Sequence, residues 1–173
     1  LGNERAKVNL AEIKGGYIDV ALGDTMPKDM AKKEVPWQID IDRLHLAKTN
    51  FQLHLPGDTT SVHAYFGEAT ARHALLKLKD NTYKVATLDW HDGAAAYNRN
   101  FIPRTTSGFD AAHISLNRLH LGVDSFCYAN NTIDLRIRAT HFTEQSGLRV
   151  NALQGVFHTD STRLSLQDFR LEM

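Results

Sequence analysis

Nine histidines are the residues of this chain with the widest chemical range, because imidazole ligates metals and exchanges protons near neutral pH. Seven of them alternate with apolar residues in segments typical of strands, which places them on the face opposite the apolar one. His45 and His120 stand at equivalent places of two similar segments, so we do not expect them to share an ion. Motifs of metal or phosphate sites are also missing, and we expect no metal and no cofactor. The seven are His45, His54, His63, His91, His113, His120 and His158.

Carboxylates are the second group that could do chemistry, as the acid and base of a glycosidase. Asp40 and Asp42 alternate with Ile39 and Ile41, which is typical of a solvated polar face. We therefore expect a protein that is not an enzyme. A carbohydrate-active β-domain that uses acids such as Asp40 or Asp89 stays open as the alternative, and further candidates are Glu34 and Asp92.

Composition excludes some partners. Among 173 residues, 20 basic and 20 acidic side chains balance, so nucleic acid is not an expected partner. The one cysteine, Cys127, excludes an intramolecular disulfide, and we expect it to be a small buried side chain between Phe126 and Tyr128. No run approaches the ~20 apolar residues of a membrane helix, and no signal peptide is visible. Because the chain begins at Leu1, we expect it to be a fragment of a longer chain.

One spacing of apolar residues recurs six times and describes the elements that must hold these side chains. Its form is apolar, any, apolar, any, any, apolar, any, apolar or Gly. Each copy has one residue too many for a flat strand, because side chains alternate faces with period two. The copies are Val8/Leu10/Ile13/Gly15, Ile39/Ile41/Leu44/Leu46, Tyr83/Val85/Leu88/Trp90, Ile114/Leu116/Leu119/Leu121, Leu148/Val150/Leu153/Gly155 and Leu164/Leu166/Phe169/Leu171.

A bulge or corner at the extra residue restores the alternation and bends the strand. The pattern therefore predicts an all-β fold, a curved antiparallel meander folded lengthwise into a U-shaped groove. A closed β-sandwich is the alternative, because a second sheet could also cover the apolar face.

The chain reads as one repetitive β-domain over residues 1–173. Arg-Leu-His-Leu occurs at 43–46 and 118–121, and the surrounding segments define approximate repeats at 38–97 and 110–172. An N-terminal hairpin is expected at 6–22 around Gly15-Gly16. Strands are expected at 38–46, 50–55, 61–68, 71–78, 82–97, 110–121, 124–129, 132–142, 147–158 and 162–172, with a turn near Asp92-Gly93 and loops at 24–36 and 98–108.

The apolar face is the remaining candidate for function. An acyl chain of about 16 methylenes would recover roughly 13 kcal/mol on leaving water for such a face. The candidate lipid-facing residues are Ile39, Ile41, Leu44, Leu46, Phe51, Tyr83, Val85, Leu88, Trp90, Ile114, Leu116, Leu119, Leu121 and Phe126.

The repeat pattern resembles the periplasmic repeats of the TamB and AsmA-like proteins. The resemblance lies in segments 146–157 and 160–171, where the spaced apolar residues follow small polar turns such as Ser146-Gly147 and Asp160-Ser161, and in 87–94. It implies a β-taco, a long U-shaped sheet with an apolar interior. It also implies a periplasmic location, in a parent protein anchored to the inner membrane of a diderm bacterium.

The function implied by the resemblance is carriage of phospholipid acyl chains between the membranes, support of outer-membrane protein assembly, or both. A TamA-type barrel protein would be the partner, through other parts of the parent chain. A purely structural or adhesin-like β-module, with a dry core, is a further alternative.

Overall fold

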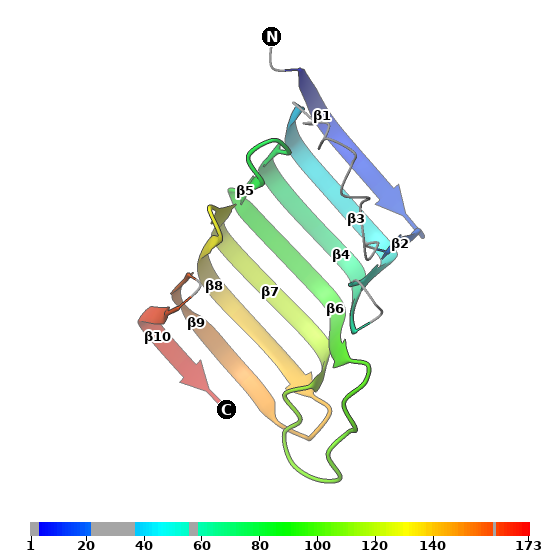
Figure 1. Ribbon diagram of the computed structural model, residues 1–173, viewed down its shortest axis with the longest axis vertical. Coiled ribbons are helices and arrows are strands. Elements are labelled where there is room, and N and C mark those ends of the chain that lie inside the picture. The colour runs from blue at the N-terminus through cyan, green and yellow to red at the C-terminus, as the bar shows by residue number, and fades with distance from the viewer. Residues whose placement is uncertain (1–3, 22–36, 56–58, 161) are drawn as a thin grey trace, which may run out of the picture.

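Ten β-strands make up the regular structure of residues 4–21, 37–55, 59–160 and 162–173, which the computed structural model describes (Figure 1). The predicted all-β fold is confirmed. In the same residues, no helix is long and apolar enough to cross a membrane. The strands are β1 (Arg5–Lys14), β2 (Tyr17–Ala21), β3 (Gln38–His54), β4 (Thr60–Lys77), β5 (Thr82–Val85), β6 (Thr87–Arg99), β7 (His113–Ala129), β8 (Thr132–Glu144), β9 (Arg149–Thr159) and β10 (Leu164–Glu172).

All ten strands belong to one sheet. From β3 to β10 each strand pairs antiparallel with the next, except that β5 and β6 are two segments of one line, both lying between β4 and β7. The predicted meander is therefore confirmed for this part of the chain. The alternative of a closed sandwich is wrong for the described residues, because they form no second sheet.

The predicted hairpin at 6–22 is wrong. β1 and β2 both run parallel to β3, with Val8 opposite Ile41 and Ile18 opposite Phe51. Gly15 has a φ of 66°, and its N–H donates to the carbonyl of Ala47 at 2.9 Å. The chain thus bends at Gly15 and continues along the same neighbour. A glycine pair permits a bend as readily as a reversal, so local sequence does not decide between them.

Of the two predicted loops, 24–36 lies outside the described residues, and 98–108 corresponds to a connection at 100–112 between β6 and β7. Tight turns at 80–81, 130–131 and 146–147 connect neighbouring strands, and the last of these is the expected turn at Ser146-Gly147. Their residues include Asn81, Asn130 and Asn131, with φ of 48°, 52° and 60°. Asparagine tolerates this left-handed conformation better than most residues.

Several predicted pairs of short strands are single long strands. Segments 38–46 and 50–54 are both part of β3, and 113–121 and 124–129 are both part of β7, whereas residues 55 and 110–112, also predicted as strand, lie outside these strands. The expected turn near Asp92-Gly93 is a bend inside β6. Lys48, Asp92 and Arg118 have φ near +50° within these strands. One residue in that conformation redirects the strand while the ladder continues on both sides.

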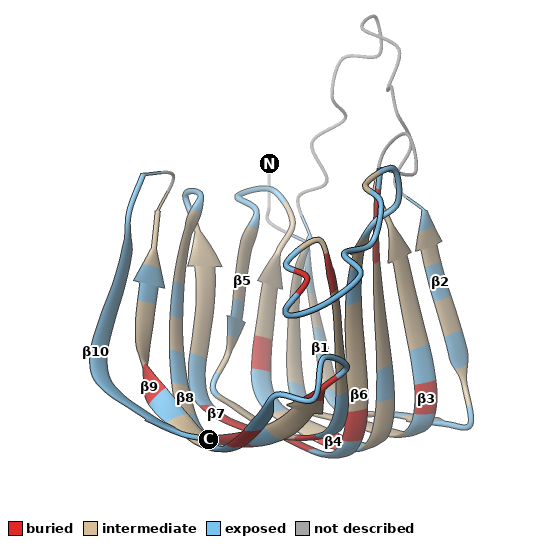
Figure 2. Ribbon diagram, turned by 90° about the horizontal axis from the view of Figure 1, so that it is seen from below, coloured by how far each residue is buried: buried red, intermediate tan, exposed pale blue. Residues whose placement is uncertain are grey.

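Two lines of such bends give the sheet a U-shaped cross-section. Figure 2 looks along the sheet and shows strands rising on both sides of a floor. In β3, residues 38–41 belong to the first wall, 43–47 to the floor and 49–54 to the second wall. The bend between floor and second wall contains Lys48, Asp92 and Arg118, and the bend between first wall and floor contains His73 and Asp168.

In the copies outside β1, the extra residue falls at a bend and keeps the apolar side chains in phase. Leu44 and Leu46 of the floor lie opposite Ala71 and Ala69, and Ile41 of the first wall lies opposite Ala74. In β1 the inward-facing residue differs from the prediction by one position, because Ala11 and not Leu10 points to the inner face. Leu10 lies opposite Arg43 and is 57% exposed, whereas Ala11 lies opposite Leu44.

The two Arg-Leu-His-Leu segments do not occupy equivalent places. β3 and β7 run in opposite directions, because three antiparallel pairings separate them. Segment 39–46 enters the floor from the first wall. Segment 114–121 enters it from the second wall, where Ile114 lies opposite Tyr97. The repeated sequence therefore encodes a bend of a strand and not a stacked unit.

The apolar face is the inner, concave face of the U. Ala69, Trp90 and Leu119 form a buried cluster. Ala64 of the second wall and Leu46 of the floor both pack against it. Side chains of a wall and a floor meet in one cluster only on the inside of the bend.

Candidate functional site: the apolar trough

The inner face consists of rows of apolar side chains that cross the sheet from strand to strand. We call this surface the apolar trough. Its walls and floor are set by the register, and each row contains one inward residue per strand. The rows are Ile39, Leu76, Tyr83, Tyr128 and Ile133; Val85, Phe126, Leu135 and Phe157; Leu44, Ala71, Leu88 and Val123; Leu46, Ala69, Trp90 and Leu121; Phe51, Ala64, Ala95 and Leu116; and Leu53, Val62, Tyr97 and Ile114.

The structure brings all fourteen predicted lipid-facing residues onto this one face, from Ile39 in β3 to Phe126 in β7. Trp90 and Leu119 are buried, at 8% and 5% exposed. The other twelve are half-buried. A half-buried apolar face is what a single curved sheet leaves when no second layer covers it. Their contact with lipid stays a prediction.

Trp90 joins the floor to the second wall without leaving a free polar group in the trough. Its ring lies 4.6 Å from that of Phe66, centroid to centroid. Its Nε1–H donates to the carbonyl of Tyr65 at 3.1 Å. The indole sits so close to Gly93 that a Cβ there would lie 2.2 Å from Nε1. Gly93 is therefore required for this packing. Because the indole N–H is hydrogen-bonded, the part of Trp90 that faces the trough is apolar.

The buried polar side chains of the inner face have partners within the chain. Thr140 donates from Oγ1 to the carbonyl of His120 at 2.6 Å. Glu144 lies opposite Leu116 and is 2% exposed. Burial raises its pKa, but hydrogen bonds led by those from Ser146 outweigh this and hold the pKa below its ordinary value. Throughout the described chain, every buried side-chain nitrogen and oxygen has a hydrogen-bond partner.

The outer face of the floor gathers imidazoles that the sequence did not reveal as neighbours. His45 bridges Glu12 at 2.9 Å and Glu68 at 3.5 Å. The ring of His120 lies 4.1 Å from that of His91 and 4.8 Å from that of His141, centroid to centroid. Burial, and then the charges of those two rings, lower the pKa of His120.

Only the cross-strand register, such as His120 opposite His141, brings these histidines together. The prediction that strand histidines lie opposite the apolar face is confirmed for His45, His91 and His120, which share none of the inward rows. Within the described ranges no group of three or more histidine, cysteine or acidic side chains could hold a metal ion.

Of the carboxylates proposed for acid–base chemistry, Asp40, Asp42 and Asp89 lie in ion pairs, and Glu34 lies outside the described residues. Asp40 accepts a hydrogen bond from Arg5 at 2.7 Å, and the hydrogen bonds of Arg5 and then Gln38 lower its pKa. Asp89 and Asp124 both bind Arg138. A catalytic general acid needs a raised pKa, so the direction at Asp40 is the opposite of that role.

The expectation for Cys127 is wrong. Phe126 and Tyr128 both point into the trough, so Cys127 between them lies on the outer face. There it is half-buried, opposite Lys84 and Asp134. The alternation of side chains along a strand predicts the outer face for Cys127 once Phe126 and Tyr128 are assigned to the inner face.

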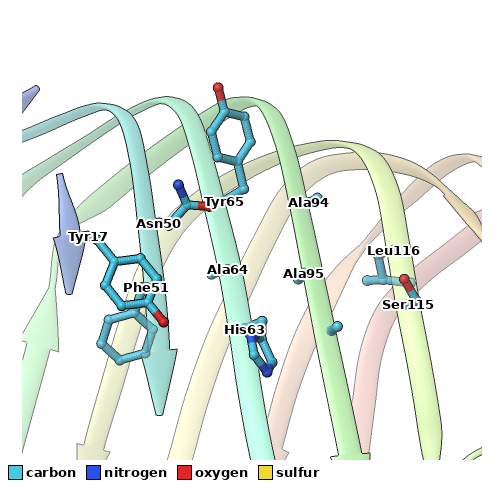
Figure 3. A pocket seen from close by; sticks show the side chains of 11 residues that line it. Tyr17, Asn50, Phe51, His63, Ala64, Tyr65, Ala94, Ala95, Ser115 and Leu116 are labelled. Atoms are coloured by element: carbon cyan, nitrogen blue, oxygen red, sulfur yellow. The ribbon is translucent and has the colours of Figure 1, made fainter. Parts of the chain in front are cut away.

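A shallow depression of about 150 Å³ marks the outer side of the second wall (Figure 3). The backbones of β4 and β6 form its base at Ala64 and Ala95, and Tyr17, His63 and Tyr65 stand around it. Its walls hold no facing pair of catalytic groups, and it is not part of the apolar trough.

Comparison of the chain with models of protein families, with curated protein sequences and with solved structures found no match. The fold itself defines the class, a single-layer and mainly antiparallel β-sheet that is bent into a U with an apolar concave face.

Proposed function

We propose that this chain is a non-enzymatic segment that carries lipid acyl chains along the apolar trough. One observation supports the proposal most strongly: six rows of apolar side chains line the concave face from β3 toward β9, and the described residues place no second layer over them. Exposed apolar surface of this extent is typical of a binding site.

The dimensions of the trough match a hydrocarbon chain. Eight lines of strands lie side by side, and at ~4.8 Å between neighbours the trough extends about 34 Å. A membrane core of about 30 Å contains two acyl chains end to end, so one chain needs roughly half of this length. The floor, five residues wide in β3, spans about 16 Å, which is room for more than one chain side by side.

The cellular setting follows from the resemblance to the TamB and AsmA-like repeats. We propose a periplasmic segment of a longer envelope protein, anchored to the inner membrane of a diderm bacterium and involved in lipid transport or outer-membrane protein assembly. A TamA-type barrel protein would bind other parts of the parent chain. The U-shaped section agrees with this resemblance.

The alternative of a purely structural module requires a dry core. Twelve of the fourteen candidate residues are half-buried and thus open to a ligand, which favours the lipid proposal. No observation supports the carbohydrate-active alternative, because the carboxylates of Asp40 and Asp89 form ion pairs with Arg5 and Arg138.

Photocrosslinking tests the proposal directly. A photoreactive residue at Leu44, half-buried in the floor, should give lipid adducts after incubation with phospholipid vesicles, detected by mass spectrometry of the intact chain. The matched control is Arg43, the neighbouring residue on the outer face. Equal labelling at both positions, or labelling at Arg43 alone, would contradict a lipid-filled trough.

Adjacent substitutions provide a second test. Leu119→Asp places a carboxylate among the core side chains and should abolish lipid co-purification or destabilise the fold. His120→Ala should do neither, since its side chain lies on the outer face. Native mass spectrometry measures bound lipid in each variant, and urea denaturation measures stability. If His120→Ala lost bound lipid and Leu119→Asp kept it, the lipid would lie on the outer face and the proposal would be contradicted.

A further inference from the structure

The outer face of the floor has a depression of about 500 Å³ beside the bend between the floor and the second wall. Three imidazoles from three neighbouring strands line it, those of His91 in β6, His120 in β7 and His141 in β8. Arg118 lines it at the bend itself, and Asp92 is the one carboxylate among the described residues around it. The depression therefore holds more potential cations than anions, on the face of the sheet opposite the apolar trough.

These three histidines contact one another, whereas five others pair with carboxylates. The ring centroid of His120 lies 4.1 Å from that of His91 and 4.8 Å from that of His141. Within the described part of the chain, neither the three imidazoles nor Arg118 form an ion pair. Four groups that can carry positive charge thus lie together without a bound carboxylate. The histidines that do pair with one are His45, His54, His73, His113 and His158.

His120 lies at the centre of the row, and the strands on both sides contribute charges to its surroundings. Of the two carboxylates near it, Asp89 binds Arg138, which leaves Asp92 as the only acidic group there without an ion pair among the described residues. Burial, and then the charges of the two adjacent imidazoles, lower the pKa of His120. The ring is therefore mostly uncharged near neutral pH. The titratable and charged groups that face it are His91, Asp89 and Asp92 of β6, Arg118 of its own strand, and His141 and Arg138 of β8.

We propose that the three imidazoles and Arg118 bind a phosphate group, and that the site takes up protons as this group binds. A guanidinium donates two parallel hydrogen bonds to phosphate oxygens, and a protonated imidazole donates a charge-assisted one. A dianion among the rings offsets the repulsion between their positive charges and so favours their protonated forms. The phosphate group is that of a free ion or of an ester such as a lipid headgroup. The site does not depend on the proposed function, because the trough lies on the other face.

Sulfate is the probe for the first test, because it remains a dianion over the pH range in which histidine titrates. Isothermal titration calorimetry of the whole chain should show binding about tenfold tighter at about pH 6 than at about pH 8, as uptake of one proton requires. The heat of binding should also differ between buffers of different ionisation enthalpy, which measures the number of protons taken up.

Three asparagine variants test the charges of the site. Arg118→Asn removes a cation and suits the backbone, because asparagine tolerates the φ of 51° there. It should weaken sulfate binding about tenfold. The matched control is Lys48→Asn, which removes the same charge at a φ of 49° on the same line of bends, outside the depression, and should change the affinity less than about twofold. Asp92→Asn removes the opposing carboxylate and should strengthen binding.

Histidine variants test the coupling to protons. His120→Ala should weaken sulfate binding and reduce its dependence on pH, an effect that loss of packing alone would not produce. His158→Ala is the control, since its imidazole binds Asp134 elsewhere on the outer face. Inorganic phosphate and glycerol 3-phosphate then distinguish the two sources of the phosphate group. Tighter binding of the ester would assign a headgroup or a similar ester, and tighter binding of the free ion would assign inorganic phosphate. Both results support the site.

Three results would overturn the proposal. The first is absence of sulfate and phosphate binding at about pH 6. The second is the same affinity in Arg118→Asn as in Lys48→Asn. The third is weaker binding in Asp92→Asn, which would indicate a cation as the ligand. Crosslinking at Leu44 reports on the trough alone, so this proposal and the proposed function can fail separately.

Discussion

Trp90 is the side chain on which the bend between floor and second wall depends. It is 8% exposed, packs against Phe66 and donates its N–H to a backbone carbonyl. Trp90→Ala removes these contacts and should lower the free energy of unfolding by about 3 kcal/mol, measured by urea denaturation. Trp37→Ala is the control, because Trp37 is 40% exposed and its loss should cost less than about 0.5 kcal/mol. Equal losses would contradict a core on the concave face.

Asp110 should make the stability of the chain depend on pH in acid. The backbone N–H of Thr105, the side chain of His113 and the N–H of Ala112 bind its carboxylate and lower its pKa to about 2. A pKa lowered by folding means that the stabilisation is complete above pH ~4 and is lost as the pH falls toward 2.

Asp110→Asn tests this sign. The variant should be less stable than the original chain at pH 7, and the difference in urea midpoint should shrink as the pH falls from about 4 to about 2. A difference that stays constant over this range would show that the ionised carboxylate contributes nothing.

At the scale of the strand, each bend requires a residue in an unfavourable backbone conformation. Lys48 allows the resulting loss of folding free energy to be measured. It is exposed and has a φ of 49° inside β3. The left-handed conformation is unfavourable for residues with a side chain and is worst for β-branched ones. Lys48→Gly should therefore raise the free energy of unfolding by roughly 0.5–1 kcal/mol, and Lys48→Val should lower it.

Lys84 is the matched control for this prediction. It is exposed in β5 and is not among the residues with positive φ. In an ordinary extended strand the order reverses, so Lys84→Val should be tolerated and Lys84→Gly should destabilise. Thermal unfolding of the four variants measures both orders. The same order at both positions would mean that Lys48 is not in a bend.

For the molecule as a whole, we expect stability to fall from the centre of the sheet to its edges. β4, β6 and β7 contribute Ala69, Trp90 and Leu119 to the buried cluster, whereas every residue of β10 is exposed. Amide hydrogen exchange at low protein concentration should therefore be slowest in these three strands and fastest in β10. Uniform protection across the sheet would indicate one cooperative unit.

The sequence sufficed for the fold class and for the membership of the apolar face. The extra residue in copies such as 39–46 and 164–171 predicted bends, and bends occur there. The sequence did not show which residues of β1 face inward, because Leu10 and Ala11 are both apolar and either could occupy the inner position. It also missed the continuity of β3 through Lys48, because a left-handed residue inside a strand leaves no sequence signal when it is a lysine.

The sequence determined which side chains share a face. Alternation along a strand is a local property of the backbone, and each extra residue shifts the alternation by one position. The tertiary structure decided that this face is the concave one, that β2 continues β1, and that His91, His120 and His141 are neighbours. These features depend on register and bend direction between residues far apart in the chain, and no local pattern encodes them.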